Sequence, residues 1–395
     1  MKNPSYRSVL LSSTTSELGG ALFTACNSIV IYELTGSASA LGSIWLMYYF
    51  PSFFMQLFIG PYVDRWSRKK IMIHCQIIRM LLAIVLLMSL ILDAYTIALI
   101  YIIQIIVGLI MPIFTPANQA ILPTILNNED LTRANASLDS IRQVMVITGP
   151  LLSGLFVDYF AIEWVLLLIT IAFAVSAGLL VIIQENYQQN KVRKKWITEF
   201  QEGLHYFFAQ RIIVLLGVFL GFVQFGVGVT IVTTIPFITT ILEQPYSAYG
   251  IFMAGFPLGY LIGAFIKQRL ENPDGLGILF TSLMIGGCTY LSLGFTPWYS
   301  LGVVTEIIAG IVIAIFNIHY VTLIQILIPN HVMGKVTSVR LLIMRTMMPL
   351  GILFATLTTT FISIRVLYII IGCVICVSAT LGYVFLRNRN FEYKG

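Results

Sequence analysis

The ionisable residues inside the longest apolar stretches of the sequence are the first candidates for chemistry. Glu17 lies nine residues into the apolar stretch 8–32, about 13 Å along a helix that rises 1.5 Å per residue. A charged carboxyl group at that depth in a membrane is costly, so such a group can take up and release protons or attract a cationic substrate. Glu17 is therefore the first candidate for a proton carrier. The alternative is that a hydrogen bond to a neighbouring helix makes it a packing residue.

Asp139 and Arg142 form a second candidate pair. Their spacing of three places both side chains on one face of a helix, where an ion pair would lower the cost of burying either one. The pair is either structural or part of the coupling between proton and substrate. Glu306, seven residues into the stretch 299–328, faces either a central cavity or the hydrated headgroups. Arg79 is expected to extend its long side chain toward the membrane surface.

The composition indicates that a lipid bilayer surrounds most of this chain. Of its 395 residues, 58% are hydrophobic and only 10% are charged, whereas soluble domains contain about 25% charged residues. A bilayer core about 30 Å thick requires about 20 apolar residues per helix. Suitable stretches predict an all-α polytopic membrane protein with twelve transmembrane helices, at 8–32, 38–62, 71–92, 96–119, 136–158, 161–183, 212–242, 246–268, 276–295, 299–328, 333–361 and 363–386.

Basic residues predict the orientation of these helices. If the N-terminus is inside, the cytoplasmic connections hold nearly all Lys and Arg residues outside the spans, and the outer connections hold only Arg365. This asymmetry is typical of membrane proteins with short loops and places both termini in the cytoplasm. The net charge of +6 is then explained by the anionic inner surface of a cell membrane, which we expect to be bacterial. No nucleic-acid partner is needed to explain it.

A polar segment divides the chain into two pseudo-symmetric six-helix halves. Residues 185–195 are the longest polar run and fall between the sixth and seventh stretches. We expect a first half at 1–184, a cytoplasmic linker at 185–210 and a second half at 211–395, a repeat that is typical of transporters. The linker has apolar residues at helical spacing: Trp196, Ile197, Phe200, Leu204 and Phe207. They predict an amphipathic helix that either lies on the inner membrane surface or faces the cytosol.

The loop after the second stretch carries a motif. It reads Gly60-Pro-Tyr-Val-Asp64-Arg65-Trp-Ser-Arg68-Lys69-Lys70 and resembles the Gly-x-x-x-Asp-Arg-x-x-Arg-Lys loop of the major facilitator superfamily. The glycine would permit close helix approach, and Asp64 would hold an Arg or a helix N-terminus across the interface. The resemblance implies a conformational latch made by Gly60, Asp64, Arg65, Arg68 and Lys69. A simple cluster of positive charge would explain the basic residues but not the Gly and the Asp.

A second motif resembles an element of antiporters in the same superfamily. Gly149-Pro150-Leu-Leu-Ser153-Gly154 is similar to Gly-Pro-x-x-Gly-Gly, with Ser153 in place of one Gly. The Gly-Pro pair would bend the helix, and the small residues would let a neighbouring helix pack against the bend. The alternative is an ordinary kinked membrane helix. Other stretches are similar to the macrolide-efflux branch of drug:proton antiporters, at 34–38, 114–117, 200–203 and 334–336.

The resemblance to that branch covers nearly the whole chain and implies a function. It implies a secondary exporter of amphiphilic small molecules, of the macrolide and multidrug type linked to antibiotic resistance, which works by proton antiport and alternating access without a cofactor or metal ion. Siderophore exporters are built on a similar plan, so export of a siderophore or another metabolite is the alternative. Two departures from these relatives bear on proton coupling. Gln104, Val107 and Gly108 stand where many relatives carry an Arg, and Gly20 stands where many carry the Asp of a Ser-x-x-Gly-Asp pattern.

Other classes of function find less support. A polytopic membrane enzyme would need an active site, and the sequence has no HExxH or P-loop motif and only short outer loops. A sensor that does not transport is a third reading on the same scaffold. The Cys373 and Cys376 pair lies in an apolar stretch without a nearby His, so it is assigned no role. We expect a monomer that binds an amphiphilic small molecule, protons and bilayer lipids.

Overall fold

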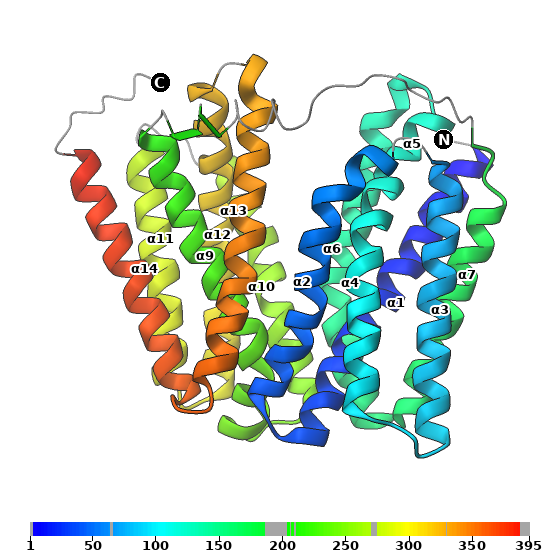
Figure 1. Ribbon diagram of the computed structural model, residues 1–395. Coiled ribbons are helices and arrows are strands. Elements are labelled where there is room, and N and C mark those ends of the chain that lie inside the picture. Colours follow the sequence, from blue (N-terminus) through cyan, green and yellow to red (C-terminus); the bar gives the residue numbers. More distant parts are fainter. Residues whose placement is uncertain are drawn as a thin grey trace. The chain divides into compact units, whose positions relative to one another are not determined.

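The described part of the chain is helical, as the sequence predicts. The computed structural model describes residues 3–63, 66–185, 204–205, 207–208, 211–269, 275–328 and 330–387. Every element with assigned bounds in these ranges is a helix (Figure 1). The elements are α1 (Pro4–Thr35), α2 (Ala38–Val63), α3 (Arg68–Ile91), α4 (Ile97–Ala120), α5 (Leu122–Ile125), α6 (Asn128–Tyr159), α7 (Ile162–Val181), α9 (Arg211–Pro236), the π-helical η1 (Phe237–Ile241), α10 (Tyr246–Arg269), α11 (Gly275–Phe295), α12 (Tyr299–Leu327), α13 (Asn330–Thr358) and α14 (Ile364–Arg387).

The long helices suit a bilayer. Within the described residues, ten helices are long and apolar enough to cross a membrane, and Leu342–Thr358 of α13 is a shorter apolar helix. A helix satisfies its own backbone N–H and C=O groups, which lipid cannot do. The chain is therefore a multi-pass α-helical membrane protein, and the predicted fold class is confirmed.

Local sequence signals explain where the helices begin and end. The Asn3 side chain accepts a hydrogen bond from the Ser5 backbone N–H at 2.9 Å and caps the beginning of α1. Gly36, with a φ of 59°, follows its last residue and ends the helix. Helix α6 begins at Asn128, well before the apolar stretch that starts at residue 136. Glu129 and Asp130 in its first turn explain the extension, because acidic side chains stabilise a helix N-terminus.

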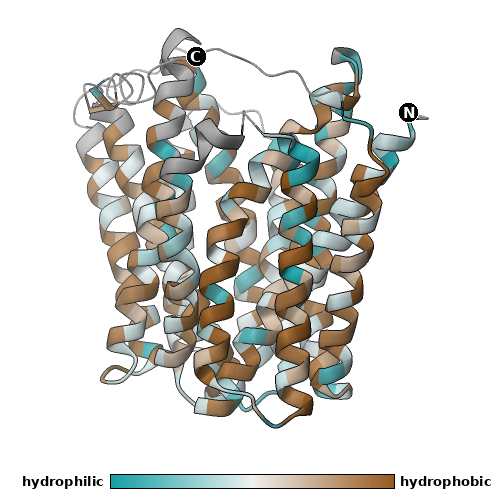
Figure 2. Cartoon of the chain, turned by 45° about the vertical axis from the view of Figure 1, so that its right-hand side comes forward, coloured by the Kyte–Doolittle hydropathy of each residue, from teal (hydrophilic) through white to brown (hydrophobic). Residues whose placement is uncertain are grey.

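Helix α3 shows how the outside of the protein suits lipid. Its buried face contains the polar residues Gln76 and Arg79. Its exposed face is apolar, with side chains three or four residues apart: Ile77, Leu81, Val85 and Met88. A surface helix of a soluble protein has the opposite distribution. Figure 2 shows hydrophobic residues along most of the helix lengths and many of the hydrophilic residues near the helix ends.

The chain divides into two compact units. Unit 1 falls within Met1–Val192 and also includes Pro245–Ile251, and unit 2 falls within Arg193–Gln244 and Phe252–Gly395. Helices α1 to α7 thus belong to unit 1, and α9 to α14 belong to unit 2 apart from the first turns of α10. In unit 1, α1 packs against α6 and α7. The Oγ atoms of Ser12 and Ser176 are 2.8 Å apart at the α1–α7 contact, because two small side chains let the helices approach closely.

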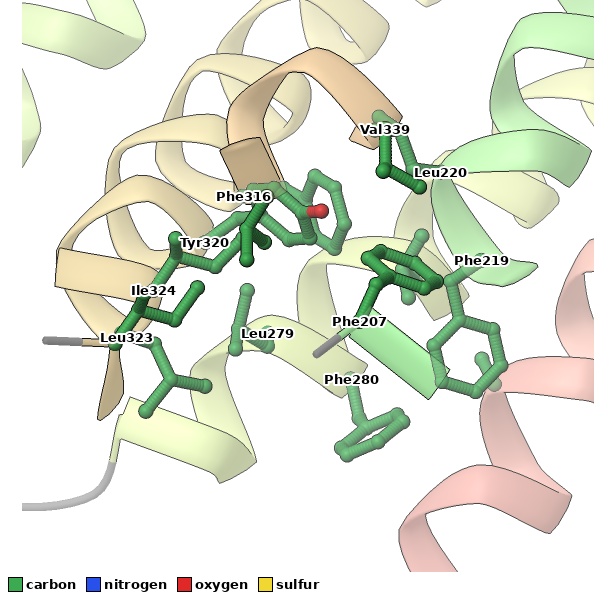
Figure 3. Close-up of a cluster of buried hydrophobic side chains, with 14 residues drawn as sticks. Phe207, Phe219, Leu220, Leu279, Phe280, Phe316, Tyr320, Leu323, Ile324 and Val339 are labelled. Carbon is green, nitrogen blue, oxygen red and sulfur yellow. The ribbon is translucent and has the colours of Figure 1, made fainter. Parts of the chain in front are cut away.

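The core of unit 2 contains the described end of the segment that precedes α9. Phe207 is only 2% exposed and packs with Phe219, Leu220 and Phe280 (Figure 3). Gly217 leaves the room, since a Cβ atom there would lie 2.5 Å from the Phe207 ring. Leu204 also packs against this cluster. Trp196, Ile197 and Phe200 of the predicted amphipathic helix lie outside the described residues.

Candidate functional site

Two candidate residues that are far apart in the sequence approach each other in unit 1. Glu17 lies near the middle of α1, and Arg142 lies near the middle of α6. Arg142 Nε is 3.8 Å from Glu17 Oε1, and the two side chains are 39% and 30% exposed. This distance is too long for a charge-assisted hydrogen bond. The two side chains therefore attract each other but leave their hydrogen-bonding atoms available.

Asp139 lies on the same side of Arg142, as its spacing of three implies. Arg142 Nη1 is 4.0 Å from Asp139 Oδ1, and the Asp139 side chain is 75% exposed. Because Asp139 is so exposed, solvent screens its charge far more than that of Glu17. Arg142 thus has one partly buried acidic neighbour from another helix and one exposed neighbour from its own.

Arg79 does not reach toward the membrane surface. It is only 4% exposed, and its guanidinium group lies among α1, α4 and α7. The expected extension to the surface is therefore wrong. The reason is that neutral groups inside unit 1 stabilise the guanidinium group. Arg79 Nη1 donates a hydrogen bond to Ser16 Oγ at 3.1 Å, and the guanidinium carbon lies 4.2 Å from the centre of the Phe173 ring.

The residues around Arg79 hold it in one position. Gln76 Nε2 donates to Ser16 Oγ at 2.6 Å, and Arg79 Nη1 is 3.4 Å from Gln76 Oε1. A Cβ atom at position 20 would collide with Arg79 Nη2, so Gly20 provides the space for the guanidinium. Glu17 is near enough to interact with Arg79 electrostatically. Among the described residues, no carboxylate lies within ion-pair distance of Arg79, and its Nε has no acceptor.

Glu306 occupies a different environment in unit 2. It lies about two turns into α12, opposite Gly255 of α10, where an added Cβ would be 3.2 Å from the Glu306 Cβ. Tyr290 and Tyr368 are near enough to interact with it electrostatically. Thr233 donates a hydrogen bond to the Tyr368 hydroxyl at 3.1 Å. No cationic group of the described residues lies within ion-pair distance of Glu306.

The Gly149 to Gly154 motif lies where α6 contacts two other segments of unit 1. A Cβ atom at Gly149 would collide with the Ala21 side chain of α1, and one at Gly154 would collide with the Tyr246 carbonyl oxygen. Pro150 lies inside the helix, and Ser153 Oγ donates to the Gly149 carbonyl at 2.7 Å. Both glycines thus permit close backbone approach, which is the role that the motif predicts for small residues.

The beginning of α3 and the end of α7 cap each other in unit 1. The Glu185 carboxylate accepts hydrogen bonds from the backbone N–H groups of Arg68 and Lys69, at 2.9 and 3.2 Å, and from the Ser67 hydroxyl. Lys69 Nζ donates to the carbonyl oxygens of Val181 and Ile183, at 2.8 and 2.7 Å. Each cap places a charge at the helix end where it is favourable.

The structure describes only part of the predicted latch. Lys69 serves a contact within unit 1, while Asp64 and Arg65 lie outside the described residues, and the surroundings of Gly60 are not described either. Sequence reasoning missed Glu185 as a functional candidate and gave Arg79 the wrong position. In the sequence, Glu185 is the first residue of a polar linker, and Arg79 is a basic residue whose side chain is expected at the membrane surface. Only their partners on other helices reveal them.

Within the described residues, no group of three or more His, Cys, Asp or Glu side chains could hold a metal ion.

The comparisons with known proteins agree with the helical architecture. The family model described as Major Facilitator Superfamily matches residues 9–351. The chain is 24% identical over 404 residues to the MFS-type transporter YfmI of Bacillus subtilis (strain 168), an alignment that covers 97% of each chain.

Two further similarities extend over nearly the whole length. The chain is 24% identical over 382 residues to macrolide efflux protein A of Streptococcus pyogenes, with 93% of each chain covered. A solved structure of a bacterial homologue of the iron transporter ferroportin, in an inward-facing state, matches with a TM-score of 0.75. That match covers 97% of this chain and 99% of the other at 14% identity, so it shows the fold alone.

Proposed function

Because this chain belongs to the major facilitator superfamily, a family of transporters and not of enzymes, we propose that it is a secondary exporter of amphiphilic small molecules driven by proton entry. Its two halves would alternate access to a central site between the two sides of the membrane. The similarity to a macrolide efflux protein over 93% of both chains supports export as the direction. The Gly149 to Gly154 motif supports antiport.

We propose that Glu306 carries the proton. The single observation behind this proposal is that no cationic group of the described residues lies within ion-pair distance of Glu306. An unpaired negative charge inside a helical bundle costs far more than a neutral carboxylic acid, so a site without a cation suits cycles of proton uptake and release. Glu17 is the second candidate, because it differs from Glu306 in having a cationic side chain close by, with Arg142 Nε 3.8 Å from its carboxylate. Asp139 is too exposed to be coupled strongly to the state of the transporter.

The remaining parts of the proposal concern orientation and switching. The distribution of basic residues supports cytoplasmic positions for both termini. Asp64 is proposed as the latch residue that favours one conformation without contacting the substrate. Arg68 and Lys69, which follow it in the motif, support this role indirectly, because their contacts with the segment after α7 fix the beginning of α3.

Export of a siderophore or another metabolite is the second candidate function. The observation that favours it is the presence of two arginines around Glu17, since many such metabolites carry acidic groups that guanidinium groups bind well. The two candidates differ in the substrate and share the mechanism.

Inside-out membrane vesicles that contain the protein test this function. We expect energised vesicles to accumulate a macrolide or an amphiphilic dye and to lose internal protons at the same time. A protonophore should stop the accumulation. If vesicles with and without the protein accumulate every member of a panel of cationic, neutral and anionic amphiphiles equally, export of amphiphiles is contradicted.

A further inference from the structure

We propose that Arg79 and Arg142 form a site for one carboxylate group of the bound molecule, so that the substrates of this exporter include amphiphiles with a single negative charge. The transport step of this inference rests on the proposed function. The binding step does not, because it can be measured on a protein that is not transporting.

The charges around Glu17 are not balanced. The partly buried Glu17 carboxylate of α1 lies 3.8 Å from Arg142 of α6, while Arg79 of α3 lies beyond ion-pair distance of any described carboxylate and interacts with Glu17 only electrostatically. Asp139 adds a second acid only from an exposed position at 4.0 Å. A net positive charge at this depth is unfavourable unless another anion or water compensates it. A monoanionic group would bring Arg79, Arg142 and Glu17 to a net charge of zero.

Arg79 is held in place without being neutralised. The described groups that touch its guanidinium are neutral: the Ser16 hydroxyl, the Gln76 amide and the rings of Phe173 and Phe114. Nε finds no acceptor in the described structure although it is fully buried. Gly20 keeps the space that Nη2 occupies. These residues keep a positive charge inside unit 1 that the described side chains do not cancel.

Arg142 provides the accessible hydrogen-bond donors. Its side chain is 39% exposed, and its two acidic neighbours lie at 3.8 and 4.0 Å. None of its N–H groups donates a hydrogen bond to a described residue at the usual charge-assisted distance of about 2.7–2.9 Å. A guanidinium group with free donors binds a carboxylate through two parallel hydrogen bonds. Arg142 would therefore contact the carboxylate, and Arg79 would act through its charge as a positioning residue.

Aromatic side chains on α2 suit the apolar part of such a molecule. On α2, Trp45 and Tyr49 stack with ring centres 5.9 Å apart, and Tyr48 packs edge-on against Tyr49 at 5.0 Å. Tyr48 is also near enough to interact with Arg79 electrostatically. Aromatic rings that pack with Tyr48 near Arg79 favour an amphiphile over a small inorganic anion.

A pair of probes that differ in one group tests the inference. We would measure the binding of 11-(dansylamino)undecanoic acid and of its primary amide to the full chain in phosphatidylcholine nanodiscs by dansyl fluorescence. We expect the acid to bind at least about tenfold more tightly than the amide, because only the acid carries a negative charge that can pair with Arg142 and be attracted by the charge of Arg79.

Three variants test whether the preference for the acid depends on Arg142. Arg142→Gln should remove the preference for the acid and leave the affinity for the amide unchanged. Arg142→Lys keeps the charge but loses the paired donors, so it should retain part of the preference. Arg345→Gln removes an arginine from the apolar part of α13 in unit 2 and should leave the preference intact.

The outcomes separate this inference from the proposed function. Equal binding of the acid and the amide to the unmodified protein would overturn it. If, in addition, chloride protected the unmodified protein but not Arg142→Gln from thermal unfolding, the site would be one for an inorganic anion. Selective binding of the acid without transport in vesicles would instead contradict the proposed function and leave the carboxylate site standing.

Discussion

The carboxylate of Glu185 accepts a hydrogen bond at 2.9 Å from the backbone N–H of Arg68, 117 positions away in the sequence. The contact joins the segment after α7 to the first turn of α3, next to the loop that carries the superfamily motif. A helix N-terminus has several N–H groups without partners inside the helix, and this one carboxylate satisfies two of them.

Removal of this cap should weaken unit 1. We expect Glu185→Ala to lower the free energy of unfolding by about 1–2 kcal/mol, because the N–H groups of α3 lose a charged acceptor. Glu185→Gln should cost less, since its amide oxygen can still accept a hydrogen bond. Thermal unfolding of the purified protein in detergent measures both effects. Equal stability of Glu185→Ala and the unmodified protein would contradict the capping role.

Lys69 should matter more than its neighbour Lys70. Lys69→Met removes the cation that binds two carbonyl oxygens at the end of α7, and we expect a loss of about 0.5–1 kcal/mol. Lys70 is exposed, so Lys70→Met is the matched control and should leave the unfolding temperature unchanged. Identical effects of the two substitutions would show that only the positive charge of the loop is important.

The adjacent residues Phe207 and Phe208 should respond very differently to truncation. Phe207 is 2% exposed in the core of unit 2, while Phe208 is 63% exposed. Phe207→Ala should lower the free energy of unfolding by about 3–5 kcal/mol, because it leaves a cavity beside Phe219 and Phe280. Phe208→Ala should have a small effect. Denaturation curves of the two variants decide this, and a larger loss for Phe208→Ala would exclude the described packing.

Gly154 should not tolerate even a methyl group. Its added Cβ would meet the backbone of Tyr246, so Gly154→Ala should cost about 1–3 kcal/mol through forced backbone movement. Gly178 in α7 has no atom within 4 Å of an added Cβ. Gly178→Ala is therefore the control, and it should be neutral or stabilise the helix by up to about 1 kcal/mol. A matching pair of unfolding temperatures would argue against the close approach at Gly154.

Glu306→Gln should separate transport from its driving force. The amide has nearly the size of the carboxylic acid but cannot exchange a proton, so downhill movement of substrate should persist while proton-driven accumulation is lost. Glu129→Gln, at an exposed position in the first turn of α6, is the control and should remain coupled. Inside-out vesicles measure accumulation and proton loss together. Continued coupling in Glu306→Gln would show that Glu306 does not carry the proton and would make Glu17 the first candidate.

The amino-acid sequence is sufficient to predict the helices, the membrane and the family. A spanning helix needs about 20 apolar residues in a row, and this is a local property that can be read along the chain. The superfamily motif after Gly60 is likewise a run of adjacent residues. The spacing of Asp139 and Arg142 predicts their proximity for the same reason, because both lie on one helix.

Contacts between helices depend on the tertiary structure. Glu17 meets Arg142 and Arg68 meets Glu185 across more than a hundred positions. The hydrophobicity of a spanning helix does not reveal which other helix its buried face contacts, because lipid is as apolar as the protein interior. The sequence context of Arg79 suggests a side chain at the membrane surface. Only the fold shows that its guanidinium group is buried and contacts Ser16, Gln76 and Phe173.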